Sequence, residues 1–179
     1  FPGRTDRFVT SYELEETMDI TNRLCYEIRT QKINVWKAAM ESDQAVNIKY
    51  ASKYASCSNY WKKAAEQNKA LKALNTVDIK KDIERRYNEW AKDKDSKYQN
   101  VLTEIENIVA KRKSYLVAKT YLSEALVEGT ELPHFALFLC AKLDKMDPEN
   151  KDSEMEAIIQ LVKSFYEDYD QLTEQKLIA

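Results

Sequence analysis

The chain has 179 residues, of which 44% are hydrophobic and 32% charged, and its formal net charge is −2. This apolar content excludes a disordered chain, and the near-neutral mixture of charges argues against a nucleic-acid surface. No apolar run approaches the roughly 18–20 residues needed to cross a bilayer, so no membrane span is expected.

Turn residues are too few for a fold built on tight hairpins. The chain has two glycines and three prolines, whereas hairpin turns usually need glycine or asparagine at positive φ. Frequent Ala, Leu, Lys, Glu and Gln favour helix instead. We therefore expect an all-α fold, an elongated antiparallel bundle of about six helices, which forms a single helical domain over residues 1–179.

The first residues are expected to lead into this bundle. Residues 1–9 form a leading segment with a turn at Pro2-Gly3. Thr10 and Glu13 have the spacing of a capping box, which predicts a first short helix. A longer helix follows from about 19 to 42, with an apolar stripe formed by Ile20, Leu24, Ile28, Val35, Trp36 and Met40.

A helix from 43 to 74 is the centre of the predicted bundle. Ser42 or Asp43 fits its N-cap. Side chains at three- and four-residue steps share one side of it: Val46, Tyr50, Tyr54, Cys57, Trp61, Ala64 and Ala65. An aromatic stripe of this kind usually lies in a core. The alternative is a partly exposed aromatic face for a ligand or for the rest of a larger protein, with Tyr50, Tyr54 and Trp61 as candidates.

The next two helices are separated by a polar stretch. The third begins at Asn75 or Thr76. Residues 91–96 have no apolar side chain beyond an alanine, and we expect them to be a solvated link. The fourth helix then runs from 97 to 128, with Gly129 as the residue just past its end.

Two further helices complete the predicted bundle. Pro133 fits the first turn of the fifth. This helix is apolar nearly all round, so we expect it to be deeply covered, by this chain or by protein outside it. Asp147 fits the N-cap of the sixth helix, with Pro148 at its first position, and Leu172 ends it.

Residues suited to catalysis or metal binding are scarce. The only histidine, His134, follows Pro133 at a helix start, where a surface or capping role is favoured over that of a buried base. Glu131 and His134 match a Glu-x-x-His pair once, and no second pair exists. Only Gly3 and Gly129 are available for a phosphate-binding loop, which excludes one. We therefore predict no catalytic residue, no metal site and no cofactor.

The three cysteines are far apart and lack the spacing of metal ligands: Cys25, Cys57 and Cys140. We expect them to be small buried apolar side chains. A Cys25–Cys57 disulfide between neighbouring helices is the alternative in an exported protein.

Three segments resemble one known family. They are FPGRT at 1–5, NVWKAAM at 34–40 and SDQAVNIKYASKYASCSNYWK at 42–62. Together they are similar to the bacterial serine dipeptidyl-peptidases that include dipeptidyl-peptidases VII and XI. The resemblance covers roughly the first seventy residues and returns at 168–179, whereas the middle matches only in its helical character.

The resemblance implies a chymotrypsin-type double β-barrel interrupted by a large helical domain, to which this chain would correspond. The domain would cap the active-site cleft of an exported peptidase, in the periplasm or at the cell surface. Its partners would be the catalytic barrels and, through the parent's cleft, the peptide substrate. The catalytic triad would lie in the barrels, the substrate-binding residues stay unassigned, and a hinge is expected at Pro2, Gly3 and Arg4.

A second hypothesis comes from another class. A free-standing helical module could use its long fourth helix and its aromatic faces to bind a partner protein. The sequence leaves open the substrate side-chain preference and the oligomeric state of a parent protein.

Overall fold

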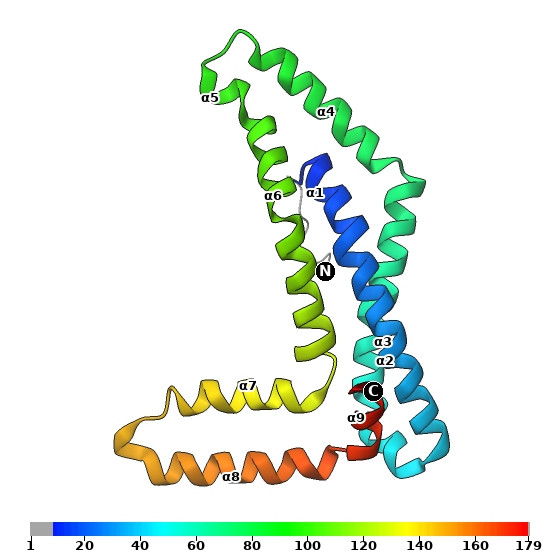
Figure 1. The fold of residues 1–179 in the computed structure, drawn as a ribbon, viewed down its shortest axis with the longest axis vertical. Helices are drawn as coiled ribbons and strands as arrows, with labels where there is room; N and C mark the ends of the chain where they lie inside the picture. The colour runs from blue at the N-terminus through cyan, green and yellow to red at the C-terminus, as the bar shows by residue number, and fades with distance from the viewer. Residues whose placement is uncertain (1–8, 179) are drawn as a thin grey trace, which may run out of the picture. The chain divides into compact units, whose positions relative to one another are not determined.

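The computed structural model describes residues 9–178, and every regular element in that range is a helix (Figure 1). The all-α prediction is therefore confirmed. Two elements are π-helices and one is a 3₁₀ turn, labelled η. In chain order the elements are α1 (Ser11–Glu16), η1 (Thr17–Asn22), α2 (Arg23–Ser42), α3 (Gln44–Ala73), α4 (Thr76–Ala91), α5 (Ser96–Gln99), α6 (Val101–Tyr121), η2 (Leu122–Val127), α7 (Glu131–Leu143), η3 (Pro148–Asn150), α8 (Lys151–Asp168) and α9 (Gln171–Ile178). None of the described helices has the length and apolarity that a membrane span requires.

The chain divides into two compact units. The first comprises the chain up to Tyr26 together with Lys62–Thr120. The second comprises Glu27–Trp61 together with the chain from Tyr121 onward. Helices α2 and α3 each contribute residues to both units.

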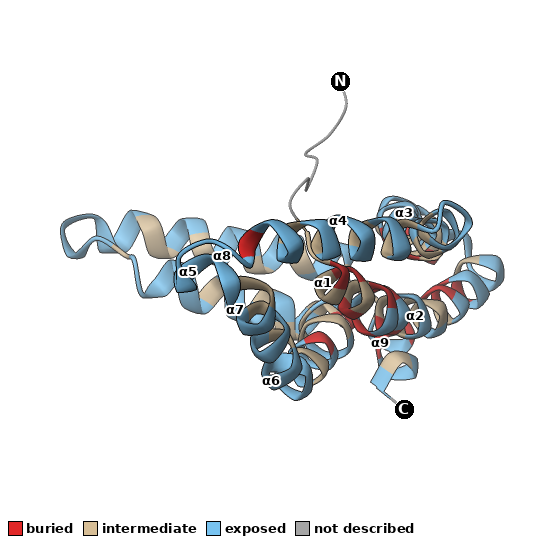
Figure 2. Ribbon diagram, turned by 90° about the horizontal axis from the view of Figure 1, so that it is seen from above, coloured by how far each residue is buried: buried red, intermediate tan, exposed pale blue. Residues whose placement is uncertain are grey.

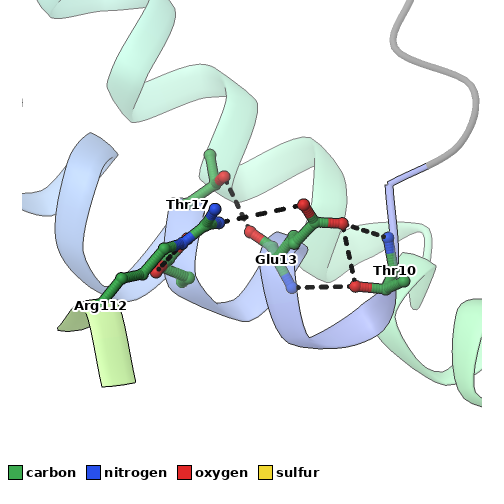
Figure 3. A network of polar contacts seen from close by, with 5 residues as sticks. Thr10, Glu13, Thr17 and Arg112 are labelled. Carbon is green, nitrogen blue, oxygen red and sulfur yellow. Dashed lines mark hydrogen bonds and ion pairs between the residues drawn. The ribbon is translucent and has the colours of Figure 1, made fainter. Parts of the chain in front are cut away.

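Helix starts follow the sequence closely. The capping box at α1 is confirmed: Thr10 Oγ1 accepts a hydrogen bond from Glu13 N at 3.3 Å, and Glu13 Oε2 accepts one from Thr10 N at 3.1 Å (Figure 3). Asp43 and Asp147 likewise accept a backbone N–H from two residues further on, at 2.7 and 3.0 Å. Asp147, however, caps the 3₁₀ turn η3, and α8 begins at Lys151 rather than at Pro148 as predicted. These side chains satisfy N–H groups that have no partner inside the helix.

The expected start of a new helix near residue 19 is instead a continuous joint. The π-helix η1 connects α1 to α2 without a break. A π-turn displaces the backbone hydrogen bonds from their α-helical pattern. A side chain of α3 donates a hydrogen bond to one carbonyl oxygen of this segment. Asn68 Nδ2 donates to Met18 O at 2.9 Å, while Asn68 Oδ1 accepts from Asn22 Nδ2 at 2.8 Å.

Charged side chains hold α1 and η1 within the first unit. Glu84 of α4 accepts from both the backbone N and the hydroxyl of Ser11, each at 2.5 Å. This carboxylate lies at the N-terminal end of α1, where the helix dipole favours negative charge. Arg112 of α6 binds the buried carboxylate of Glu16 and lies 3.9 Å from that of Glu13 (Figure 3).

The aromatic stripe of α3 lies in the core of the second unit, as its spacing predicts. Tyr50 is fully buried, and its ring meets that of Trp36 edge-on with centroids 5.4 Å apart. Trp61 is partly buried and donates from Nε1 to Thr30 Oγ1 at 2.8 Å. The buried core residues are Ile33, Trp36, Ala39, Val46, Tyr50 and Cys57, with Met40, Tyr54, Trp61 and Leu177 packed against them.

Two predicted helices are interrupted. The expected helix from 97 to 128 is divided into α5, α6 and η2, with Asn100 between the first two. The expected sixth helix ends at Asp168 rather than Leu172. Tyr169 is extended there, and Asp170 Oδ2 accepts from Thr173 N at 2.8 Å to begin α9. A capping aspartate offers the backbone an alternative to a continuous helix, which explains this break.

No disulfide joins the three cysteines, all of which lie within residues 9–178. Cys57 is buried, Cys25 is half-buried and Cys140 is exposed. The alternative of a Cys25–Cys57 disulfide is therefore wrong, and the expected burial is met by Cys57.

Gly129 is required for a reason other than the one predicted. Residues just past a helix end commonly have a positive φ, but no described glycine does. Instead the π-helix η2 brings its backbone close. A Cβ atom added at Gly129 would lie 1.9 Å from the carbonyl oxygen of Ala125.

Substitution of Gly129 by alanine should therefore destabilise the second unit. Because the obstacle is a backbone carbonyl, the turn must shift, and overpacking of this kind costs about 1–3 kcal/mol or more. Urea unfolding followed by circular dichroism measures the loss. Ala136→Ser, at an exposed position of α7, is the matched control and should change the free energy of unfolding by less than about 0.5 kcal/mol. Equal values for the two variants would contradict the close approach.

Candidate functional site

A cleft of about 400 Å³ lies in the second unit, between α2 and α3 on one side and the start of α7 and the end of α8 on the other. Its lining combines cations of α2 and α3 with carboxylates and aromatic rings of α7 and α8. The central residues of this lining are Lys32, Trp36, Lys53, Glu131, His134 and Phe165. Mixed charge and aromatic surface in a concave site is typical of a binding site.

Lys53 connects three elements across this cleft. Its ammonium group forms an ion pair with Glu131 Oε1 at 2.7 Å and donates to the backbone oxygen of Asp168 at 3.0 Å. That oxygen lies at the C-terminal end of α8, where the helix dipole favours a cation. The same ammonium group lies 4.5 Å from the ring centroid of Tyr50. Lys53 thus fixes the ends of α7 and α8 against α3.

The buried carboxylate of Glu174 is the second connection. Glu174 belongs to α9 and is only 1% exposed. Its Oε1 accepts from the hydroxyl of Tyr50 at 3.1 Å, and its Oε2 accepts from the backbone N of Glu131 at 2.8 Å. Glu131 is the first residue of α7, so the carboxylate occupies the N-terminus of that helix. Burial and the nearby carboxylates of Glu131 and Glu174 raise the pKa of Tyr50, which keeps its hydroxyl protonated as a donor.

Two cations of α2 bind η2 and the turn that follows it. Lys32 donates from Nζ to the backbone oxygen of Glu128 and lies 4.3 Å from the ring centroid of Trp36. Burial lowers the pKa of Lys32. Arg29 donates from Nε and Nη2 to the two carboxylate oxygens of Glu124, at 2.7 and 3.2 Å. A bidentate pair of this kind fixes orientation as well as distance.

The carboxylate of Glu131 is largely buried in the cleft. Burial raises its pKa, and the ion pair with Lys53 only partly offsets this. Its Oε2 atom and the Nε1 atom of Trp36 are both buried, and neither has a hydrogen-bond partner among the described residues. Perturbed pKa values and unsatisfied polar atoms concentrate at functional sites, so these two residues identify the cleft as the candidate site.

Three side chains of catalytic type line the cleft. Ser56 and Cys57 line the cleft together with His134. His134 is exposed, with Nδ1 3.6 Å from Glu128 Oε1, and in the described part of the chain no hydrogen bond joins it to Ser56 or Cys57. A nucleophile needs such a base within hydrogen-bond reach. The described residues also contain no cluster of three histidine, cysteine or acidic side chains suited to a metal ion.

The sequence indicated only part of this site. Tyr50 and Trp61, two of the aromatic candidates, lie in or against the core. Lys53 and Glu174 were missed, because each resembles an ordinary charged residue of a helix surface. Glu131 was considered only as a metal ligand paired with His134, and its ion pair with Lys53 was not foreseen. The one available signal was the position of Lys53, three residues from Tyr50 on the same helix face. The hinge candidates Pro2, Gly3 and Arg4 lie outside the described residues.

The variant Tyr50→Phe should destabilise the second unit by about 1–3 kcal/mol. The substitution keeps the ring and removes the hydroxyl that Glu174 accepts, which leaves a buried carboxylate with one donor fewer. Urea unfolding of both proteins measures the difference. Tyr60→Phe on the same helix, where the side chain is 56% exposed, is the control and should have little effect. A loss of equal size in the two variants would show that the Glu174 contact contributes nothing.

The pH dependence of stability should have opposite signs for two carboxylates of this unit. The pKa of Glu131 is raised above its ordinary value of 4.5 by burial, so the folded state holds its proton more tightly. Its contribution to the free energy of unfolding therefore falls as pH rises through the interval above 4.5. The pKa of Asp170 is lowered below 3.8 by the hydrogen bond from Thr173, so its contribution is lost as pH falls below that value.

Urea unfolding from about pH 3 to about pH 7 tests both signs. The stability of the wild type minus that of Glu131→Gln should decrease as pH rises. The stability of the wild type minus that of Asp170→Asn should decrease as pH falls. Parallel curves for the two variants would be incompatible with the environments of these two carboxylates.

Comparison with known proteins gives one consistent family. Dipeptidyl-peptidase 7 of Porphyromonas gingivalis is 35% identical over 180 residues, which cover 99% of this chain and 24% of that protein. The Asp/Glu-specific dipeptidyl-peptidase of Flavobacterium psychrophilum is 28% identical over 186 residues, covering 99% of this chain and 26% of that protein. The chain thus spans about a quarter of the length of these relatives.

A solved structure shares the fold. The crystal structure of Porphyromonas endodontalis DPP11 in complex with the dipeptide Arg-Glu matches 97% of this chain and 25% of its own, with a TM-score of 0.75 and 26% identity. The family model described as peptidase S46 matches residues 1–179. The resemblance found in the sequence is therefore confirmed, and this chain belongs to the peptidase S46 family.

Proposed function

We propose that this chain is a non-catalytic helical cap domain of an exported serine dipeptidyl-peptidase, which removes dipeptides from the N-termini of peptides. The observation that carries the proposal is the match of all 179 residues to the peptidase S46 family, in relatives about four times as long. Relatives with two different names match this same region. We therefore assign it to the step that those enzymes share, and not to the choice of substrate side chain.

The chemistry of the cleft agrees with a supporting role. Most of its charged groups are already paired within the second unit, as in Lys53 with Glu131 and Arg29 with Glu124. A serine peptidase needs a serine, a base and an orienting acid in contact. We place that triad in the catalytic barrels of the parent protein, which are the partners of this domain, together with the peptide bound between them.

The cap is proposed to close over the parent's active site by a hinge. The hinge would lie at Pro2, Gly3 and Arg4, because glycine tolerates the backbone rotation that a hinge must absorb. Closure of such a domain excludes water and admits only substrates of suitable length. We place the parent in the periplasm or at the cell surface.

The free-standing interaction module is the weaker proposal. The two relatives reported above are about four times as long as this chain, which favours a part of a larger protein over an adaptor.

Activity measurements on two proteins test the peptidase proposal. The purified 179-residue chain should be helical by circular dichroism and should not release dipeptides from a panel of dipeptidyl substrates. The full-length protein that carries it should release them, and a serine-directed inhibitor should abolish that activity. Turnover by the chain alone that the same inhibitor abolishes would refute the assignment of the chemistry to the barrels. An inactive full-length protein would refute the peptidase itself.

A further inference from the structure

Helices α7 and α8 form a hairpin that the rest of the second unit leaves uncovered. The two helices lie side by side (Figure 1), with the rings of Phe135 and Phe165 stacked at a centroid distance of 4.0 Å. Neither helix has a buried residue, and their ribbons carry only the colours of intermediate and exposed residues (Figure 2). The described chain therefore does not provide the deep cover expected for the fifth helix.

The polar contacts that hold this hairpin lie at its base, where α7 begins and α8 ends. Lys53 of α3 binds both helices there, through the carboxylate of Glu131 at 2.7 Å and the backbone oxygen of Asp168 at 3.0 Å. Among the described residues, no hydrogen bond or ion pair joins residues 135–143 or 151–167 to α2, α3 or α9. The hairpin is therefore free to pivot about its base when the two contacts of Lys53 are released.

The cleft of the candidate site lies at the base of this hairpin. Phe135 and Phe165 line it from the hairpin, and Trp36 lines it from α2. Trp36 is only 3% exposed, yet its Nε1 donor has no partner among residues 9–178, and the same is true of the Oε2 acceptor of Glu131. A buried polar group without a hydrogen bond is costly, and native structures rarely keep one. Both atoms are therefore suited to a ligand, which reaches them only when a wall of the cleft moves.

The charged groups of the cleft are already matched within the second unit. Arg29 pairs with Glu124 and Lys53 pairs with Glu131, each at 2.7 Å. Lys32 donates to a backbone oxygen of the turn before α7. A charged ligand would have to displace one of these partners, and a displaced partner would be left as an uncompensated charge. An uncharged ligand is therefore the class that this cleft favours.

The remaining lining determines which uncharged ligand fits. It offers one N–H donor on Trp36, one carboxylate oxygen on Glu131 and an apolar surface. The members of that surface are Trp36, Val127, Phe135 and Phe165. A peptide segment has a carbonyl oxygen for the donor, an N–H for the acceptor and a side chain for the aromatic rings.

We infer that the cleft is a binding site for an uncharged peptide segment, which enters when the hairpin pivots. A carbonyl oxygen of the peptide accepts from Trp36 Nε1, and one of its N–H groups donates to Glu131 Oε2. An apolar side chain of the peptide lies against Phe135 and Phe165. The volume of about 400 Å³ is in the usual range of ligand pockets. The arrangement described above is the closed state, and the peptide binds the open one.

Calorimetric titration of the full-length protein tests this site. The probe is acetyl-Ala-Phe-Ala-amide, which is blocked at both ends and has no free N-terminus for a dipeptidyl-peptidase to act on. One molecule should bind to each chain. Trp36→Phe removes the N–H and keeps an aromatic ring, and should raise the dissociation constant about tenfold. Trp90→Phe, at a side chain of the first unit that is 52% exposed, is the matched control and should leave the dissociation constant unchanged.

Release of the hairpin should have the opposite effect on binding. Lys53→Met removes both contacts at the base and keeps a long apolar side chain, so a larger fraction of the protein has the hairpin open. The peptide should then associate at least about threefold faster in stopped-flow fluorescence, because its apparent binding depends on that fraction. Lys62→Met, at an exposed position of α3, is the control and should not change the rate.

Circular dichroism establishes that each variant is folded. A peptide that does not bind, or that binds Trp36→Phe as tightly as the wild type, overturns the inference. So does an association rate that Lys53→Met leaves unchanged, since the hairpin then does not control entry. None of these measurements uses the release of dipeptides, so their outcome is independent of the test of the peptidase proposal.

Discussion

The second unit depends on one buried carboxylate. Glu174 of α9 reaches the hydroxyl of Tyr50 on α3 and the first backbone N–H of α7. A buried charge is costly unless hydrogen bonds satisfy it, and here a helix N-terminus and a neutral phenol do so. Three segments distant in sequence are thereby fixed at one point. Beside this point, Lys53 forms an ion pair with Glu131. The walls of the cleft are therefore held by pairs of residues, and removal of either member leaves the other without its partner. Such contacts favour one arrangement over others more than they add net stability.

Two π-helices, η1 and η2, interrupt the regular α-helical hydrogen bonding of the chain. A π-turn adds one residue to a helical turn and rotates the rest of the helix about its axis. At η1 the disturbed backbone hydrogen bonding is compensated by Asn68, which donates a hydrogen bond to the carbonyl oxygen of Met18. At η2 the close approach of the backbone requires Gly129, while Arg29 and Lys32 of α2 bind the segment at Glu124 and at the carbonyl of Glu128. Each irregular segment is therefore held by side chains from another helix.

Local patterns in the sequence identified most of the fold, because their physics is local. The apolar stripe and Asp43 placed a helix at 43–74, and α3 spans Gln44–Ala73. The capping box at Thr10 was predicted correctly, whereas Asp147 caps the 3₁₀ turn η3 and not the α-helix that follows it. The residues of the candidate site could not be predicted from local patterns. Tyr50 and Glu174 are 124 positions apart, and a single sequence does not reveal which surface carboxylate becomes buried beside a distant tyrosine. The apolar character of the fifth helix was visible, but periodicity reports apolar content and not which molecule covers it.

The lining of the cleft continues along α7 into that of a groove of about 530 Å³ between α7 and α8. On α7 the residues Glu131, His134 and Phe135 line the cleft, and Phe138, Ala141 and Lys142 line the groove. Their three- and four-residue steps make them one continuous stripe. A helix transmits a displacement along its length because it is stiff, so contacts at its two ends are linked in free energy.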